Sequence, residues 1–271
     1  MAGPVVVGLV VGALSAPGPA VAGPSRAPKP VRKVFDKPGT GIVFNVPAGV
    51  TTITVELVGG GGAGGAGLAA TSDSTTAWGG NGGGGGASVR CRFPAPPRDE
   101  KTGKYPLLVK VGSGGYGFTD DDGGLAGESS IGNTAVGPQR MTFRAKAQGG
   151  YGGQSAAHRG QPPRLPATNK GGQVARCITS SSGRSDDAGD PAATLATAAG
   201  GDGSPGTSGA GNKAGLGGAG GQAVNVPDGC PKGRTGLGSH GGKGNWVGNT
   251  ARAKAANGHN GCVVVTYTPG Q

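Results

Sequence analysis

Glycine recurs at every third position in the longest glycine-rich tract of the chain, residues 200 to 221. A period of three is the repeat of the polyproline II helix, which has no internal hydrogen bonds. Such helices can lie side by side when one face carries only glycine, because their backbone groups then pair between helices. The spacing therefore predicts polyglycine II helices, with a flexible linker as the alternative. The row comprises Gly200, Gly203, Gly206, Gly209, Gly215, Gly218 and Gly221; a shorter row comprises Gly233, Gly236 and Gly242.

The length of this tract limits how it can be arranged. At about 3.1 Å per residue, residues 200 to 221 would extend roughly 65 Å, too far for a straight rod inside a compact domain. The glycine row is broken at Asn212-Lys213-Ala214. We therefore expect a turn there, with two short antiparallel helices on either side.

The composition excludes two common classes of protein. The chain has 63 Gly among 271 residues and only 4% aromatic residues, too few large side chains for an enzyme with a deep apolar interior. Charged residues make up 14%, which is below the level that keeps a chain disordered by self-repulsion. Glycine packing must therefore replace much of the ordinary core.

Apolar and polar residues alternate in several short segments between the glycine tracts, which is the signature of β-strands. In residues 51 to 58, for example, Ile53, Val55 and Leu57 fall on one face. No segment has helical periodicity, so the sequence predicts an all-β protein. The expected strands are residues 41–46, 51–58, 88–93, 105–111, 141–147 and 262–267.

The N-terminus is typical of a secretion signal. Val5 to Leu14 form an apolar run too short to span a membrane, and Ala20-Val21-Ala22 is a small-x-small cleavage site. We expect a signal peptide at 1–22, a Pro-rich basic arm at 23–39 and a glycine-rich β-sandwich domain at 40–271. The protein is then secreted, with no membrane span.

Four cysteines, Cys91, Cys177, Cys230 and Cys262, are far apart and lack the spacing of a zinc site. An even number in an oxidising compartment favours two disulfides, and the sequence leaves three connectivities open. We expect Cys177 to pair with Cys230 across the long glycine tract, and Cys91 with Cys262 between two strands.

The N-terminal arm is a candidate for binding a partner. We expect Val31 to Phe35 to add to the sheet edge of a secreted or cell-surface protein, and the positive charges to steer the arm to an acidic cleft. The residues assigned to this role are Arg26, Lys29, Arg32, Lys33 and Phe35. The alternative is a solvated leader, with recognition carried by the loops.

The segment from Phe44 to Leu57, which runs directly into Gly59 to Gly65, resembles the entry of a known group of glycine-rich modules. Similar segments occur in secreted bacterial glycine-rich proteins, in phage tail-tip adhesins and in the glycine-rich domain of anaplastic lymphoma kinase receptors. Further similarity extends over about residues 34 to 268, including Asn257 to Val265. The resemblance implies a jelly-roll or TNF-like β-sandwich with an inserted polyglycine II bundle, and a binding or structural role.

No arrangement of residues predicts catalysis, a metal or a cofactor. His158, His240 and His259 stand in loops without a carboxylate at motif spacing. Asp120-Asp121-Asp122 could provide oxygen ligands for Ca²⁺, but the cluster lacks the EF-hand spacing and the distal Glu, so the sequence favours a solvated turn. The net charge of +11 favours an anionic cell envelope over nucleic acid, because aromatic residues for base stacking are scarce.

Aromatic residues beside the glycine tracts are candidates for recognition of a protein or a surface glycan, although they could instead fill gaps in the interior. They are Trp78, Tyr116, Phe118, Tyr151 and Trp246. The sequence thus predicts a secreted, non-catalytic binding or assembly module, as part of an extracellular assembly. The alternatives are a structural or ice-binding protein and a hydrolase of envelope polymers.

Overall fold

A computed structural model describes residues 28–68, 76–95, 106–119, 121–133, 142–156, 169–180, 193–210, 215–243 and 254–270. The expected signal peptide and the expected turn at Asn212-Lys213-Ala214 lie outside these residues. No helix suited to crossing a membrane occurs in the part of the chain that the structure describes.

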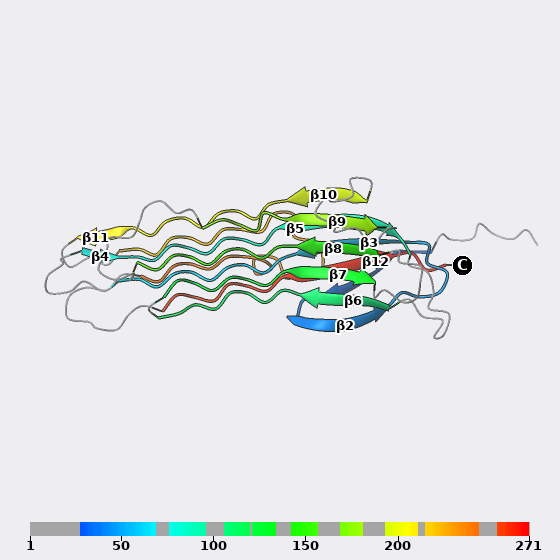
Figure 1. Ribbon diagram of the computed structural model, residues 1–271, viewed down its shortest axis with the longest axis horizontal. Helices are drawn as coiled ribbons and strands as arrows, with labels where there is room; N and C mark the ends of the chain where they lie inside the picture. The colour runs from blue at the N-terminus through cyan, green and yellow to red at the C-terminus, as the bar shows by residue number, and fades with distance from the viewer. Residues whose placement is uncertain are drawn as a thin grey trace, which may run out of the picture.

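Two antiparallel sheets form a β-sandwich at one end of the molecule (Figure 1). The first sheet has the order β1 (Val31–Phe35), β12 (Cys262–Tyr267), β3 (Thr52–Val58), β5 (Ser88–Pro94) and β10 (Thr194–Ala198). The second has the order β2 (Gly39–Asn45), β6 (Pro106–Val111), β7 (Ser129–Asn133), β8 (Thr142–Ala147) and β9 (Ala175–Ser180). At the other end, β4 (Thr76–Trp78) pairs with β11 (Ser208–Ala210). The described residues contain strands and no helix, so the expected all-β class is confirmed.

The core of the sandwich consists of the apolar residues that alternate along the strands. Ile53, Val55 and Leu57 on β3 are fully buried, as the sequence pattern predicts. Phe93 on β5 stacks on Phe143 on β8, with ring centroids 4.4 Å apart. Each such side chain contributes about 1.5–3 kcal/mol by burial, so this small core stabilises the sandwich.

The structure contains strands that the alternation did not indicate. In β7, Ile131 is the one large apolar residue, and buried Ser129 accepts a hydrogen bond from the Gly112 N–H at 3.0 Å. The sheet therefore uses small and polar residues at positions where the pattern requires apolar ones. For the same reason, the alternation of apolar and polar residues did not predict β9 and β10.

The expectation that Val31–Phe35 is a free arm is wrong. This segment is β1, and it pairs with β12 of its own sheet from Val31 opposite Tyr267 to Phe35 opposite Val263. β12 is almost entirely buried, so the strand beside it stabilises its edge. Removing residues 23 to 33 would expose β12 rather than leave the domain intact.

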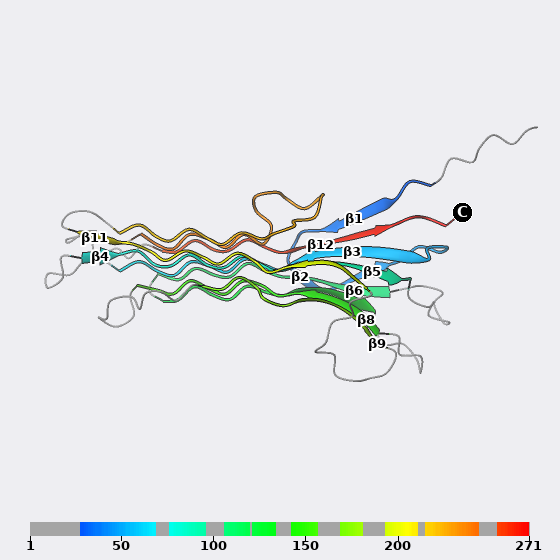
Figure 2. The same cartoon turned by 90° about the horizontal axis from the view of Figure 1, so that it is seen from above.

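Glycine-rich segments continue the strands away from the sandwich and run side by side (Figures 1 and 2). Seen from above, they form layers: the segments that continue β6–β9 lie below, those that continue β3 and β5 in the middle, and those nearest β12 above (Figure 2). We call this assembly the glycine bundle. It comprises residues 59–67, 79–87, 112–118, 121–128, 148–156, 169–174, 199–207, 215–223, 236–243 and 254–261.

Backbone hydrogen bonds within the bundle repeat every three residues. In segment 59–67, the N–H groups of Gly59, Gly62 and Gly65 donate to one neighbour, at the carbonyls of residues 87, 84 and 81. The N–H groups of residues 60, 63 and 66 donate to a second neighbour, at residues 127, 124 and 121. Residues 61 and 64 donate to a third, at 259 and 256. Successive residues thus bond to different neighbours in turn.

The register of the strands continues into the bundle. In the sandwich, Val58 on β3 is opposite Ser88 on β5. The next residues keep this pairing, because the Gly59 N–H donates to the Ala87 carbonyl at 2.9 Å and the Gly62 N–H to the Gly84 carbonyl at 2.8 Å. The sheets therefore align the glycine segments.

Close approach of these backbones excludes side chains at the contact positions. A methyl group on Gly83 would overlap the carbonyl oxygen of Gly62, and one on Gly203 would overlap that of Gly82. The halves of the long tract run antiparallel, since Gly201 bonds to Gln222 and Thr207 to Leu216. The shorter row was assigned wrongly. Gly233 and Gly236 have φ values of 71° and 63°, and Gly238 and Gly241 make the close contacts instead.

Both expected disulfide pairings are wrong. Cys91 on β5 bonds to Cys177 on β9 and joins the two sheets through the core. Cys230 bonds to Cys262 and ties the loop at residues 224–236 to the start of β12. The long glycine tract needs no disulfide across it, because its halves already bond to each other through their backbones.

We predict that Gly83→Ala lowers the free energy of unfolding by about 1–3 kcal/mol, because the neighbouring backbone has no room to move. Gly39→Ala is the matched control, since its added methyl would lie 3.7 Å from the nearest Ile42 side-chain atom. Urea unfolding measures both. Equal stability of the two variants would contradict backbone packing at Gly83.

We also predict that peptide mapping without reduction recovers Cys91–Cys177 and Cys230–Cys262. The bonds close loops with sequence separations of 86 and 32 residues. Replacing each pair by Ala should therefore cost about 4.6 and about 3.7 kcal/mol in the chain-entropy relation. A smaller loss for the Cys91–Cys177 pair than for the Cys230–Cys262 pair would contradict the role of the longer loop.

Candidate functional site

A row of large side chains crosses the outer surface of the lower layer of the glycine bundle. It consists of Tyr116, Leu125, Tyr151 and Lys170, which we call the aromatic row. Their segments are neighbours: the Gly124 N–H bonds to the Tyr116 carbonyl, Ala126 to Gly150, and Tyr151 to Lys170. The other positions in these segments face neighbouring backbones, so every third residue points outward. Tyr116 and Leu125 are 67% and 68% exposed.

Tyr151 is held along the surface. Its hydroxyl accepts a hydrogen bond from Gln148 Nε2 at 3.2 Å. Residues three apart in an extended segment are about 9 Å apart, so both side chains must lie along the bundle to meet. Gln148 is itself fixed, because its Oε1 accepts from the N–H groups of Gln173 and Val174, each at 3.1 Å. The ring of Tyr151 is thus oriented in advance, with 42% of the residue exposed.

A basic region lies beside the aromatic row, on the outer face of the second sheet. Strand register places Lys110, Ser130, Lys146 and Arg176 side by side across β6–β9. Arg144 on β8 pairs with Glu128 at 3.3 Å. Four cations and one carboxylate therefore give this part of the surface a net positive charge. The aromatic row and the residues around it form one surface, which we call the front face. Besides the aromatic row, it comprises Ser113, Glu128, Gln148, Gln173, Lys110, Arg144, Lys146 and Arg176.

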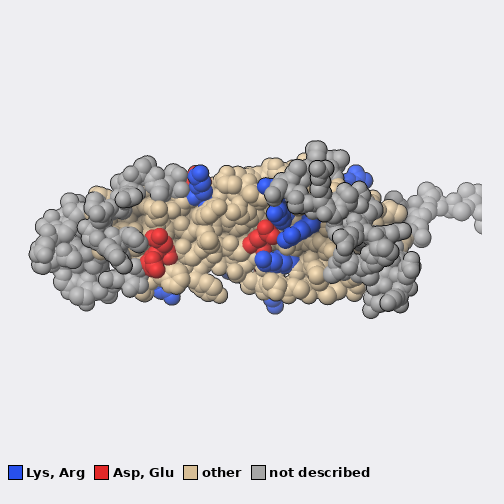
Figure 3. Space-filling model, viewed as in Figure 1, with Lys and Arg blue, Asp and Glu red and all other residues tan. Residues whose placement is uncertain are grey.

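The front face is the side toward the viewer in Figure 3. An acidic group is visible near the far end of the bundle, and a cluster of basic side chains around one acid lies toward the sandwich. The surface between the two groups is uncharged except for a basic group at its upper edge. The charge is thus arranged lengthwise along the molecule.

Three of the residues expected to take part in recognition lie at the surface. Tyr116, Phe118 and Tyr151 are all exposed, so these side chains do not fill interior gaps. Trp78 is half-buried in β4, and Trp246 lies outside the described residues. The sequence reasoning missed Leu125, which the period of three identifies once the outward position of its segment is known.

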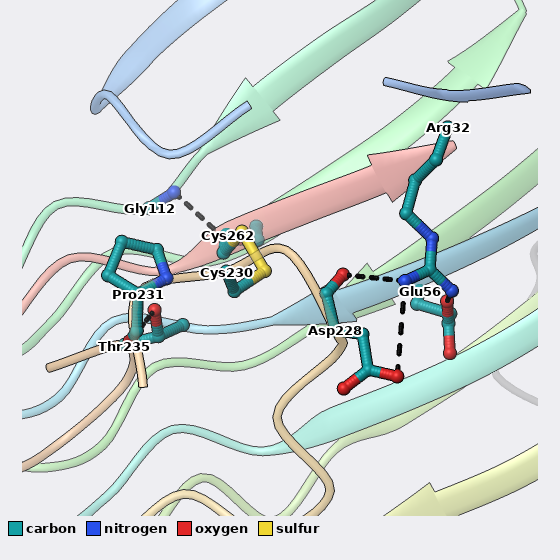
Figure 4. The surroundings of a disulfide bond; sticks show 9 residues. Arg32, Glu56, Gly112, Asp228, Cys230, Pro231, Thr235 and Cys262 are labelled. Carbon is teal, nitrogen blue, oxygen red and sulfur yellow. Dashed lines mark hydrogen bonds and ion pairs between the residues drawn. A yellow bond between two sulfur atoms is a disulfide. The ribbon is translucent and has the colours of Figure 1, made fainter. Parts of the chain in front are cut away.

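Two of the expected arm residues, Arg32 and Phe35, contact the fold of the chain itself. Arg32 on β1 approaches Glu56 on β3 at 3.9 Å, and its Nη1 donates to the Asp228 carbonyl at 3.1 Å (Figure 4). Phe35 packs edge-on against Phe44, with ring centroids 5.9 Å apart. Lys29 and Lys33 are exposed, and Arg26 lies outside the described residues.

A pocket of about 350 Å³ lies between the loop at residues 224–230 and the outer face of the first sheet. Glu56 and Arg90, which form an ion pair at 3.6 Å, both line it. Asp228, also in the lining, pairs with Lys232 at 3.7 Å. The charged residues of the lining are therefore paired, and the Cys230–Cys262 disulfide holds the loop beside them (Figure 4).

Two carboxylates of the expected acidic cluster accept hydrogen bonds from backbone N–H groups. Asp122 Oδ1 accepts from the Ser155 N–H at 2.6 Å, and Asp121 Oδ1 accepts from the Asp122 N–H. Asp120 and His158 lie outside the described residues. Within the described ranges, no three His, Cys, Asp or Glu residues gather as metal ligands would.

These features define a glycine-rich β-protein with an elongated bundle and a flat, polar and aromatic face. The chain belongs to the glycine-rich domain family, whose family model matches residues 37–268. No curated protein matches it.

We predict that Gln148→Ala speeds amide hydrogen exchange at Gln173 and Val174 roughly fivefold, because each loses a hydrogen bond with a net value of about 1 kcal/mol. Tyr151→Phe is the control, since it leaves the Gln148 Oε1 contacts in place. NMR-detected exchange measures both variants. Unchanged rates in Gln148→Ala would show that Gln148 does not hold this region.

Proposed function

We propose that the protein is a secreted, non-catalytic binding module that uses its front face to attach to a cell-surface ligand. The observation that carries this proposal is the aromatic row, in which large side chains are exposed at outward positions of a bundle without a large apolar core. Exposed Tyr and Leu side chains on a fixed backbone lose little entropy on binding, which favours contact with a partner. The glycine bundle is the rigid support.

We further propose that the bundle segments are polyglycine II helices and that the sandwich is of jelly-roll or TNF-like type. The three-residue repeat of hydrogen bonds to different neighbours supports the first assignment. The resemblance to phage tail-tip adhesins and to the receptor domains supports the second. Two disulfides and the N-terminal signal pattern support secretion.

A protein partner could bind at a second place, the outer edge of β1. This strand is at the edge of the first sheet, so a partner's strand can pair with it in β-augmentation. In this arrangement the arm does not insert into the partner's sheet. Instead the partner's strand pairs with β1, and the positive charges of Lys29 and Lys33 attract an acidic partner. This second contact fits assembly with other extracellular proteins.

The test is cosedimentation of the oxidised full chain with envelopes of the producing cells. We predict that the intact protein sediments with them and that Tyr116→Ala/Tyr151→Ala reduces the bound fraction roughly tenfold, as expected for removal of aromatic contacts. Leu216→Ala, which removes an exposed side chain from another segment, is the control.

Equal binding by the double variant and the intact protein would overturn the role of the aromatic row. Release of soluble fragments from the envelopes would instead favour the hydrolase alternative. Thermal hysteresis without envelope binding would favour an ice-binding protein.

A further inference from the structure

We propose that the ligand of the front face is an acidic polysaccharide, bound lengthwise from the aromatic row to the basic side chains of the second sheet. This inference rests on the proposed function and specifies its ligand. It follows from the combination of an oriented aromatic ring, side-chain amides and a row of cations on one flat surface.

The aromatic row suits a sugar ring. The ring of Tyr151 lies along the bundle, so one of its faces is available to the C–H groups of a pyranose, and Tyr116 and Leu125 extend this surface. Gln154 is exposed beside it and offers its amide group to sugar hydroxyls, whereas Gln173, whose Nε2 donates to the Gly171 carbonyl at 2.9 Å, offers its Oε1. A protein partner would favour a central pocket for an anchor residue, which the periodic backbone of this face does not form.

The basic row suits carboxylates along the same polymer. Tyr151 and Lys146 are five residues apart along one extended segment, which corresponds to about 16 Å. That backbone distance exceeds one sugar ring, which favours an oligomer as the ligand that reaches from the aromatic row to the cations. Lys110, Lys146 and Arg176 lie side by side across the second sheet, so the end of a lengthwise chain lies among them and its carboxylates can pair with them.

Charge also limits where an acidic chain extends from the aromatic row. Asp121 and Asp122 are exposed beyond the aromatic row, on the side away from the sandwich. They repel an anionic polymer at that end, while the cations attract it at the other. The acidic chain therefore extends from Tyr151 toward β6–β9.

The test uses polygalacturonate as the acidic probe and its methyl ester as the neutral one, with the oxidised full chain. We expect polygalacturonate to bind in calorimetry, more weakly as NaCl rises, and the methyl ester to bind at least roughly tenfold more weakly. Tyr151→Ala should lower the affinity roughly tenfold, and Lys146→Gln should lower both the affinity and its salt dependence. The matched controls, Leu216→Ala and Lys243→Gln, should bind as the intact protein does.

Three results would overturn the inference: no binding of polygalacturonate, equal binding of inorganic polyphosphate or a thymidine oligonucleotide, or unchanged affinity in Tyr151→Ala. Thermal unfolding of each variant establishes that it is folded. If polygalacturonate does not bind but envelope binding still depends on Tyr116 and Tyr151, the proposed ligand class is wrong and the proposed binding function stands. If envelope binding fails as well, both are wrong.

Discussion

A backbone hydrogen bond to a different neighbour at each successive residue is the interaction on which the glycine bundle depends. An extended segment has no internal hydrogen bonds, and a buried unpaired backbone group costs about 1–3 kcal/mol. Each segment therefore requires neighbours on several sides. Glycine is required at the contacts, because a methyl group at Gly83 would occupy the position of the Gly62 carbonyl. The same requirement explains why so many glycines coexist with so few aromatic residues.

The sandwich sets the register in which the segments of the glycine bundle pair. Isolated glycine segments could pair in many registers, since one glycine resembles the next. Here the register of the apolar strands continues into the bundle: Val58 lies opposite Ser88, Gly59 bonds to Ala87, and Gly65 bonds to Asn81. The small core and the Cys91–Cys177 bond thus act on the far end of the molecule through the strands that continue into it.

Local patterns predicted the strands with regular alternation and the contact role of the long glycine row. Strand β7 could not be predicted, because its buried Ser129 is stabilised by Gly112, a residue brought close only by the fold. Cys91 pairs with Cys177 because the sheets stack, a long-range arrangement that spacing along the chain does not encode. Of the residues expected to bind a partner, Tyr116 and Tyr151 are exposed, whereas Arg32 and Phe35 contact the chain's own fold, because β1 belongs to its own sheet.

The same backbone packing determines what kind of surface the protein can offer. Since two of every three positions in an outer segment face neighbouring backbones, the third is free of packing constraints and can vary in chemistry. These outward positions fall in rows, as Tyr116, Leu125, Tyr151 and Lys170 do, on a support too closely packed to form a deep pocket. A periodic flat surface discriminates poorly among small molecules but matches a ligand that is itself extended and repetitive. In the proposed complex, the lengthwise order of acidic, aromatic and basic groups places the acidic polymer on the sandwich side of the aromatic row.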